Sequence, residues 1–130
     1  MDAEKDKILC ERYPNLYRDR NRSSRETCMC WGFTCGDGWY SLIDELSAKL
    51  EAEIVKMKQE GVTGDDLPAA AQAKEKFGLL RFYMTHATEQ MYDMIAEAET
   101  KSGTICEDCG EPGQLRPGGW IRTLCDGCAE

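Results

Sequence analysis

The chain has 130 residues, eight cysteines and a formal net charge of −8 at pH 7, which fits one domain or a small domain followed by a metal-stabilised segment. Its charged beginning contains only a short apolar run, residues 8–10, so we expect no signal peptide and no membrane span, and a cytoplasmic location with reduced thiols. The acidity opposes binding to phosphate backbones, so nucleic acid is not an expected partner, and it suits a protein that meets basic surfaces.

Residues 1–27 are predicted to form an irregular N-terminal arm. Pro14 lies between the aromatic residues Tyr13 and Tyr17, and proline disfavours a helix interior. The arm then carries a basic cluster with few acidic residues between its members, Arg18, Arg20, Arg22 and Arg25. These arginines could contact an acidic partner, but we favour a solvated arm in which they pair with acidic neighbours.

The next segment, residues 28–39, is rich in cysteine, tryptophan and glycine. Trp31 and Phe33 alternate as in a short strand, and Gly36-Asp37-Gly38 predicts a turn into a helix. A second zinc site could be built from the cysteines outside the C-terminal segment, Cys10, Cys28, Cys30 and Cys35, but they form no Cys-x-x-Cys turn, and buried cysteine also serves as a small hydrophobe. Because His86 is the single histidine, we expect no nucleophilic Cys–His pair and no enzymatic activity.

A long amphipathic helix is predicted next, ending at Gly61. Its apolar residues recur in steps of three and four, as in a core-facing helix stripe: Trp39, Ile43, Leu46, Leu50, Ile54 and Met57. Leu42 and Val55 widen this stripe, and charged residues occupy the opposite face. Ser41 and Asp44 approximate a capping box at the start of the helix.

Residues 69–77 allow two interpretations. Four alanines within them favour a helix. The aromatic-rich run Leu79–Met84, however, predicts a strand, and pairing across a turn at Gly78 favours a β-hairpin. A second amphipathic helix is predicted from Thr88 to Gly103, with apolar positions at Met91, Met94, Ile95 and Ala98.

The C-terminal segment contains two Cys-x-x-Cys pairs separated by fifteen residues: Cys106 with Cys109, and Cys125 with Cys128. Each pair forms a tight turn that directs two sulfurs at one ion, so the two turns predict one zinc site with four cysteine ligands. The residues between them predict a hairpin with its turn at Pro117-Gly118-Gly119. Because cysteine fills every ligand position, we expect a structural zinc ion.

Three blocks of the sequence are distinctive: Cys35–Trp39, Lys74–Tyr83, and the ribbon with its Gly118-Gly119-Trp120 turn. As a set they resemble a family of small uncharacterised zinc-ribbon proteins encoded by tailed phages and prophages. The resemblance implies a phage setting and an intracellular location. It also favours the hairpin over the helix for residues 69–77, where similar sequences are rich in valine, although the alanines of this chain keep the helix open. It brings no established activity and no catalytic residues.

Together these features predict an α+β protein with a long amphipathic helix, a β-hairpin and a second helix, followed by a C-terminal four-cysteine zinc ribbon. We expect three parts: an irregular arm (1–27), an α+β core (28–103) and the zinc ribbon (104–130). The expected function is that of a phage accessory protein that docks on a host or phage protein, for example to inhibit a host antiviral defence protein. The alternative is a nucleic-acid-binding or transcription-accessory protein that uses Arg116, Trp120 and Arg122.

Overall fold

The computed structural model describes residues 1–130 and confirms the α+β class. Short 3₁₀ turns, η1 (Cys28–Trp31), η2 (Asp37–Trp39) and η3 (Gly64–Asp66), connect the main elements. These elements are α1 (Ala3–Arg12), β1 (Phe33–Thr34), α2 (Tyr40–Gln59), β2 (Ala69–Lys76), β3 (Leu79–Thr85), α3 (Glu89–Ser102), β4 (Gln114–Arg116) and β5 (Arg122–Leu124). None of the helices combines the length and the apolar character that crossing a membrane requires.

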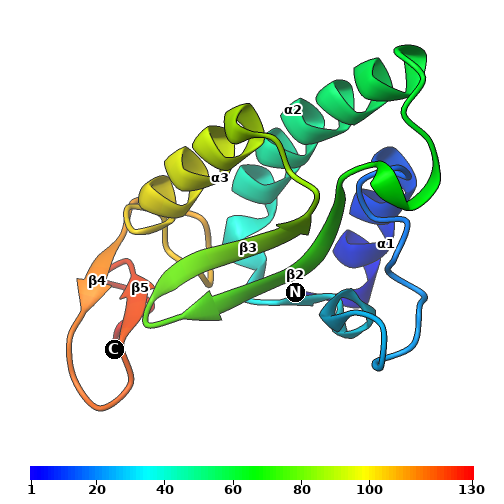
Figure 1. Cartoon of the computed structure of the whole chain (residues 1–130). Helices are drawn as coiled ribbons and strands as arrows, with labels where there is room; N and C mark the ends of the chain where they lie inside the picture. The colour runs from blue at the N-terminus through cyan, green and yellow to red at the C-terminus, as the bar shows by residue number, and fades with distance from the viewer.

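A three-stranded sheet forms the centre of the molecule, with α2 and α3 side by side over one of its faces (Figure 1). Strand β2 lies in the middle, antiparallel to β3 and parallel to the two-residue β1, where Phe33 stands opposite Ala73. The strand expected around Trp31 starts later, at Phe33, because Trp31 belongs to η1. The ribbon with β4 and β5 stands at the end of the sheet where β2 turns into β3.

Residues 69–76 form strand β2, which decides between the two interpretations of this segment in favour of the hairpin. The turn residues Phe77 and Gly78 both have positive φ, +54° and +84°, as the type I′ turn preferred by hairpins requires. Ala70 and Ala73 are fully buried in the hydrophobic core. Burial and pairing on both sides of the strand therefore outweigh the helix propensity of alanine.

Helix α2 confirms the predicted stripe, whose members are buried except for the partly buried Met57. Val55, predicted to widen the stripe, is instead exposed. The predicted capping box is wrong, because the helix begins at Tyr40 with Trp39 as N-cap and without a side-chain cap. Asp44 faces the N-terminal segment instead and accepts hydrogen bonds from Tyr13 Oη at 2.6 Å and Arg12 Nη1 at 3.2 Å.

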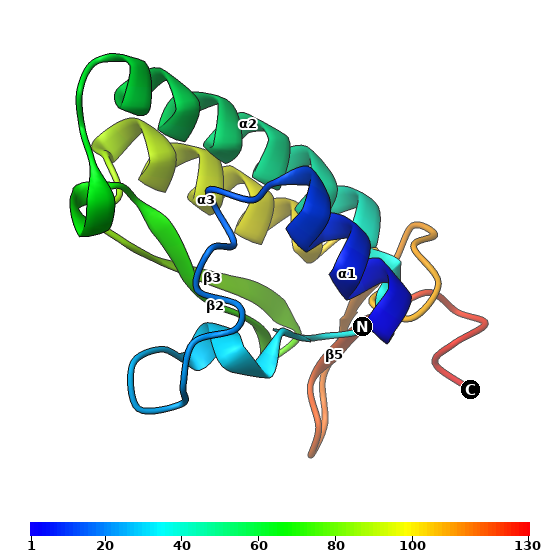
Figure 2. The ribbon, with the colours of Figure 1, turned by 90° about the vertical axis from the view of Figure 1, so that its right-hand side faces the viewer.

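The prediction of an irregular arm is wrong for residues 3–12, which form helix α1 beside α2 (Figure 2). Asp2 caps this helix, since its Oδ1 accepts a hydrogen bond from Lys5 N at 2.8 Å. Only Leu9 of α1 is buried, so its apolar pattern is too sparse to predict a helix. Residues 13–27 form turns but no helix or strand. They run beside β2, where Ala70 N donates to Leu16 O at 2.8 Å, and they contribute Leu16 to the core.

Helix α3 follows its prediction: Thr88 caps its start, with Oγ1 accepting a hydrogen bond from Met91 N at 3.2 Å, and Gly103 follows its end. The helix also covers the outer edge of β3. Ser102 Oγ accepts a hydrogen bond from Leu80 N at 2.9 Å, and Glu99 Oε2 accepts one from Phe82 N at 3.0 Å. Because unpaired N–H groups at a sheet edge invite pairing with other chains, this cover protects the edge.

Candidate metal centre

The two Cys-x-x-Cys turns lie together in the ribbon. All four sulfur atoms, from Cys106, Cys109, Cys125 and Cys128, lie within 4.8 Å of one another. The β4–β5 hairpin brings the turns together, because Gln114 pairs with Leu124 directly before the second turn. Within the first turn, Cys106 N donates to Glu111 O at 2.7 Å and Gly110 N donates to Cys106 O at 2.9 Å.

The spacing of the sulfurs fits a tetrahedral metal ion. Thiolates bound to zinc lie about 2.3 Å from the ion, so the edges of the sulfur tetrahedron measure about 3.8 Å. The Sγ atoms of Cys109 and Cys125 are 3.6 Å apart, close to that edge length. Cys128 N also donates a hydrogen bond to Cys125 Sγ at 3.4 Å, and such amide donors help to stabilise a thiolate ligand. With sulfur in every ligand position, an ion bound here would be structural.

Without a metal ion, the thiols do not lose their protons equally. Burial raises the pKa of Cys106, but hydrogen bonds from the backbone amides of Cys125 and of two residues in the first turn act against burial and leave that pKa at about 6. A hydrogen bond with the Cys125 sulfur raises the pKa of Cys128 to about 12. One thiolate therefore forms readily, whereas several neighbouring thiolates need a cation to offset their charges.

The metal centre is fixed to the core through Glu107, the residue after the first cysteine. Its side chain is buried, Oε2 accepts a hydrogen bond from Gly36 N at 2.8 Å, and its carbonyl oxygen accepts one from Gly38 N at 2.7 Å. A Cβ on Gly38 would lie 2.1 Å from the carbonyl oxygen of Cys106, and a Cβ on Gly36 would lie 2.4 Å from that of Glu107. Glycine is needed at both positions because the two backbones approach so closely.

The β2–β3 turn forms a second contact with the ribbon. Thr123 is buried, and its Oγ1 donates a hydrogen bond to Gly78 O at 2.6 Å. Leu115 packs against the same turn, since its Cδ1 lies 2.6 Å from where a Cβ of Gly78 would stand. Both sequence blocks that precede the ribbon, residues 35–39 and 74–83, thus contact it directly.

Glu107 is a site residue that the sequence did not reveal. An acidic residue beside a zinc ligand is unremarkable in an exposed turn, and its spacing from Gly36 and Gly38 follows no periodicity. Arg122 faces Glu107 Oε1 at 3.4 Å and Asp108 Oδ1 at 2.5 Å; the sequence indicated it as a possible nucleic-acid contact but not as a partner of these carboxylates. Only the tertiary contacts identify these residues as the link between metal centre and core.

The cysteines of the N-terminal half do not form a second centre. No other group of three or more cysteine, histidine or acidic side chains could hold one ion, so Cys10, Cys28, Cys30 and Cys35 are not brought together. Burial raises the pKa of Cys10 and of Cys35 to about 12 in each case. Both residues therefore stay protonated, which disfavours a role as metal ligand or nucleophile.

Two of the four arginines of the N-terminal segment, Arg20 and Arg22, form the ion pairs with acidic residues that we favoured, whereas Arg18 bonds instead to backbone carbonyls. Arg20 Nε lies 3.1 Å from Asp6 Oδ1, and Arg18 Nη1 donates to Pro68 O at 2.6 Å. Arg22 pairs with three carboxylates. Arg25 lies on an exposed turn and has no ion-pair partner within 4.0 Å.

The arginines of the ribbon are also engaged. Arg116 Nη2 donates to Asp126 Oδ1 at 2.8 Å and to Leu124 O at 3.1 Å, and Arg122 pairs with Glu107 and Asp108. Trp120, the third residue of the nucleic-acid hypothesis, is 78% exposed. The two cations that would meet phosphates are thus neutralised by acidic residues of the same hairpin.

Comparison with models of protein families, with curated protein sequences and with solved structures finds no match for this chain. Membership of the phage-encoded family therefore stays a prediction.

Proposed function

We propose that this chain is a phage accessory protein that acts through protein–protein interaction, with one structural zinc ion holding its ribbon. The four clustered thiols support the metal, and their chemistry favours zinc, because a tetrahedral all-sulfur site suits zinc far better than calcium or magnesium. The partner would be a host or phage protein, for example a host antiviral defence protein that this chain inhibits. The phage setting itself rests on the sequence resemblance.

The observation that carries this proposal is a set of exposed apolar side chains on the ribbon hairpin and on the neighbouring β2–β3 turn, here called the ribbon tip (Phe77, Leu115 and Trp120). Phe77 is 65% exposed, Trp120 78% and Leu115 47%. Leu115 packs against Gly78, next to Phe77, and Figure 1 shows the ribbon hairpin beside this turn. Exposed aromatic side chains commonly anchor protein interfaces, and large apolar side chains left exposed on a hairpin and the turn beside it fit a binding site.

The nucleic-acid alternative has less support from the same residues. Trp120 could stack on a base, but Arg116 and Arg122 are paired with Asp126, Asp108 and Glu107. Affinity for phosphate backbones comes from cations that release counterions, and here the net charge is −8. We therefore expect no saturable binding to DNA or RNA at physiological salt. Salt-sensitive binding that is lost in an Arg116→Glu/Arg122→Glu variant would reverse this ranking.

A capture experiment with matched variants tests the proposal. The immobilised protein is exposed to lysate from phage-infected bacteria, and retained proteins are identified by mass. The tip variant Phe77→Asn/Trp120→Ser removes both aromatic rings, and asparagine tolerates the positive φ of position 77. The control Tyr92→Ser removes an aromatic ring from α3 that is 53% exposed.

We expect a discrete partner that binds the parent and the Tyr92→Ser control and is lost with the tip variant. Zinc content and melting temperature are compared across the three proteins, so that loss of binding is not confused with loss of the ribbon. A partner that binds the tip variant as well as the parent would show that the ribbon tip is not the interface.

A further inference from the structure

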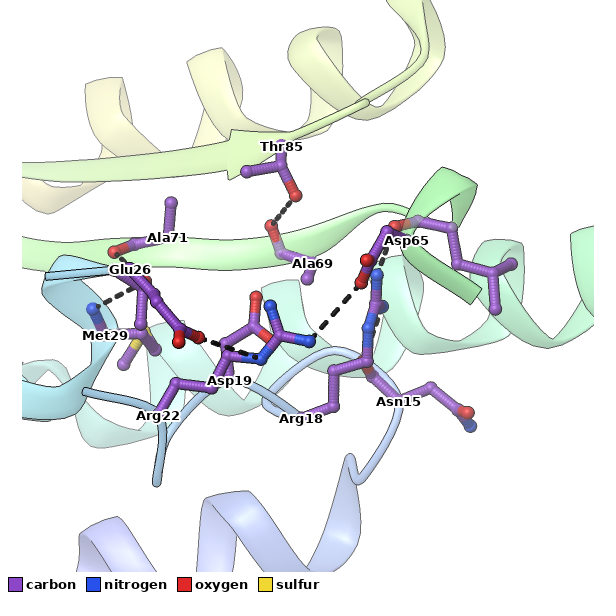
Figure 3. Close-up of polar contacts among 12 residues, drawn as sticks. Asn15, Arg18, Asp19, Arg22, Glu26, Met29, Asp65, Ala69, Ala71 and Thr85 are labelled. Carbon is purple, nitrogen blue, oxygen red and sulfur yellow. Dashed lines mark hydrogen bonds and ion pairs between the residues drawn. The ribbon is translucent and has the colours of Figure 1, made fainter. Parts of the chain in front are cut away.

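A polar cleft of about 490 Å³ lies over the outer parts of β2 and β3, away from the ribbon. The cleft is lined by Gln72 and Tyr83 from these strands, by the turns of residues 18–28, and by Asp65 and His86. Figure 3 shows the charged side chains of this region gathered between the turns and η3. Three arginines and three acidic residues line the cleft, which is thus neutral overall: Arg18, Arg22 and Arg25 with Asp19, Glu26 and Asp65.

The cleft contains a buried carboxylate without a hydrogen bond. Asp19 is only 8% exposed, and its Oδ1 accepts no hydrogen bond. Arg22 Nε lies 3.2 Å from this oxygen, but its N–H is not directed at it, so the two groups form an ion pair without a hydrogen bond. Because a buried carboxylate is normally satisfied by well-directed donors, Asp19 has capacity for a better-placed cation.

The side chain of Arg22 lies in the cleft and is held there only by ion pairs. Its guanidinium is shared among three carboxylates, at 3.2 Å from Asp19, 3.3 Å from Asp65 and 3.8 Å from Glu26. The Arg22 side chain is 45% exposed, and those of Glu26 and Asp65 are more exposed still. Arg18 differs, because it donates to the backbone carbonyls of Leu67 and Pro68 and is tied to the fold. Arg22 is therefore less firmly held than Arg18.

We propose that this cleft binds the guanidinium of an arginine side chain from a protein partner, which takes the place of Arg22 between Asp19, Glu26 and Asp65. The planar guanidinium has several N–H donors in one plane, and it suits a set of carboxylates better than the point charge of an ammonium group does. Since the cleft is neutral with Arg22 inside, a second cation is accepted only when Arg22 moves out. This inference deepens the proposed function, on which it rests, by assigning a basic chemistry to the partner.

The test uses the full chain and a capped peptide, N-acetyl-Gly-Arg-Gly-amide, titrated by NMR with the amide of Gln72 as reporter. The same peptide with glutamine or lysine in place of arginine serves as ligand control. Arg22 competes as an intramolecular ligand at high effective concentration, so we expect Arg22→Ala to bind the arginine peptide about tenfold more tightly than the parent. Arg25→Ala removes an equal charge from the same cleft but leaves Arg22 between the carboxylates. We expect its affinity for the arginine peptide to rise less than about threefold, from the change in charge alone.

In the Arg22→Ala background, Asp19→Asn should weaken binding about tenfold, because the buried acceptor loses its charge. If this double variant does not fold, Glu26→Gln/Asp65→Asn replaces it, since both side chains are exposed, and we expect a several-fold loss. The inference would be overturned if Arg22→Ala bound the arginine peptide no more tightly than the parent does, or if Arg25→Ala gained as much affinity as Arg22→Ala. It would also be overturned if the glutamine peptide bound as tightly as the arginine peptide. The titration needs no natural partner, so its failure is distinct from a failure of the ribbon-tip experiment.

Discussion

At the scale of single residues, the glycines of the Gly36-Asp37-Gly38 turn are the residues on which the docking of the ribbon depends. Gly38 N donates to Glu107 O at 2.7 Å. A Cβ added to Gly38 would overlap the backbone carbonyl groups of Cys106 and Glu107 in the ribbon. The clash involves carbonyl groups rather than a flexible side-chain end, so local rotation cannot relieve it. Any larger residue must push the metal turn away from the core.

Gly38→Ala should therefore destabilise the protein by about 1–3 kcal/mol, the usual effect of overpacking. Gly119→Ala is the control, because no atom lies within 4 Å of its added Cβ, and we expect a change of less than about 0.5 kcal/mol. Urea unfolding followed by circular dichroism measures both. Equal stability of the two variants would show that the ribbon does not sit on the Gly36–Gly38 turn in solution.

At the scale of elements, α2 connects the parts of the molecule. Its buried face meets the sheet and α3, while its polar side chains hold the N-terminal segment. Glu51 Oε1 accepts a hydrogen bond from Leu16 N at 2.7 Å, and Glu51 Oε2 accepts one from Asn15 Nδ2 at 2.7 Å. Ser47 Oγ meets Tyr17 Oη at 2.5 Å in the core. The apolar face of α2 thus packs against the sheet and α3, and its polar side chains bind the N-terminal segment.

Leu46→Asp should unfold or aggregate the protein, at a cost of at least about 3 kcal/mol, because it places an unpaired carboxylate at a position that is only 3% exposed. Lys49→Asp changes an exposed position of the same helix, and its expected cost is about 0.5 kcal/mol or less. Thermal unfolding and size-exclusion chromatography compare the two. Melting of both variants at the parent temperature would mean that the Leu46 face of α2 is not in the core.

At the scale of the whole molecule, several contacts join the ribbon to the core, so we expect the two to unfold together. Hydrogen bonds cross between them at Gly36, at Gly38 and at Gly78. The buried Trp39 also donates from Nε1 to Ile105 O at 2.9 Å. Loss of the ribbon structure would therefore remove cover from the first turn of α2.

Removal of the metal tests this coupling. We expect one zinc per chain by elemental analysis, and a strong chelator should lower the melting temperature by roughly 10 °C or more, because structural zinc contributes several kcal/mol to folding. The tryptophan emission should shift to longer wavelength as Trp39 loses its cover. Cys109→Ser should reproduce the effect, and Cys28→Ser, an exposed cysteine outside the cluster, should not. Full stability after the metal has been removed would show that the core does not need the ribbon.

Local patterns in the sequence determined the parts of this protein that depend on near neighbours. Spacing alone identified the four cysteines that the structure brings together, because each Cys-x-x-Cys turn is built within a few residues. Periodicity identified α2 and α3, since each has a continuous apolar stripe that faces the core. The turn residues between Arg116 and Arg122 likewise indicated the ribbon hairpin.

Tertiary structure alone decided what depends on distant neighbours. Helix α1 buries a single side chain, Leu9, so its stability comes from Asp2 and from packing against α2 rather than from a visible stripe. Strand β2 is extended because β1 and β3 pair with it, against the propensity of its alanines. The contact of Gly36 with Glu107 spans 71 positions, and that of Arg22 with Asp65 spans 43. Such pairs leave no periodicity in a single sequence, because the fold and not the local chain brings them together.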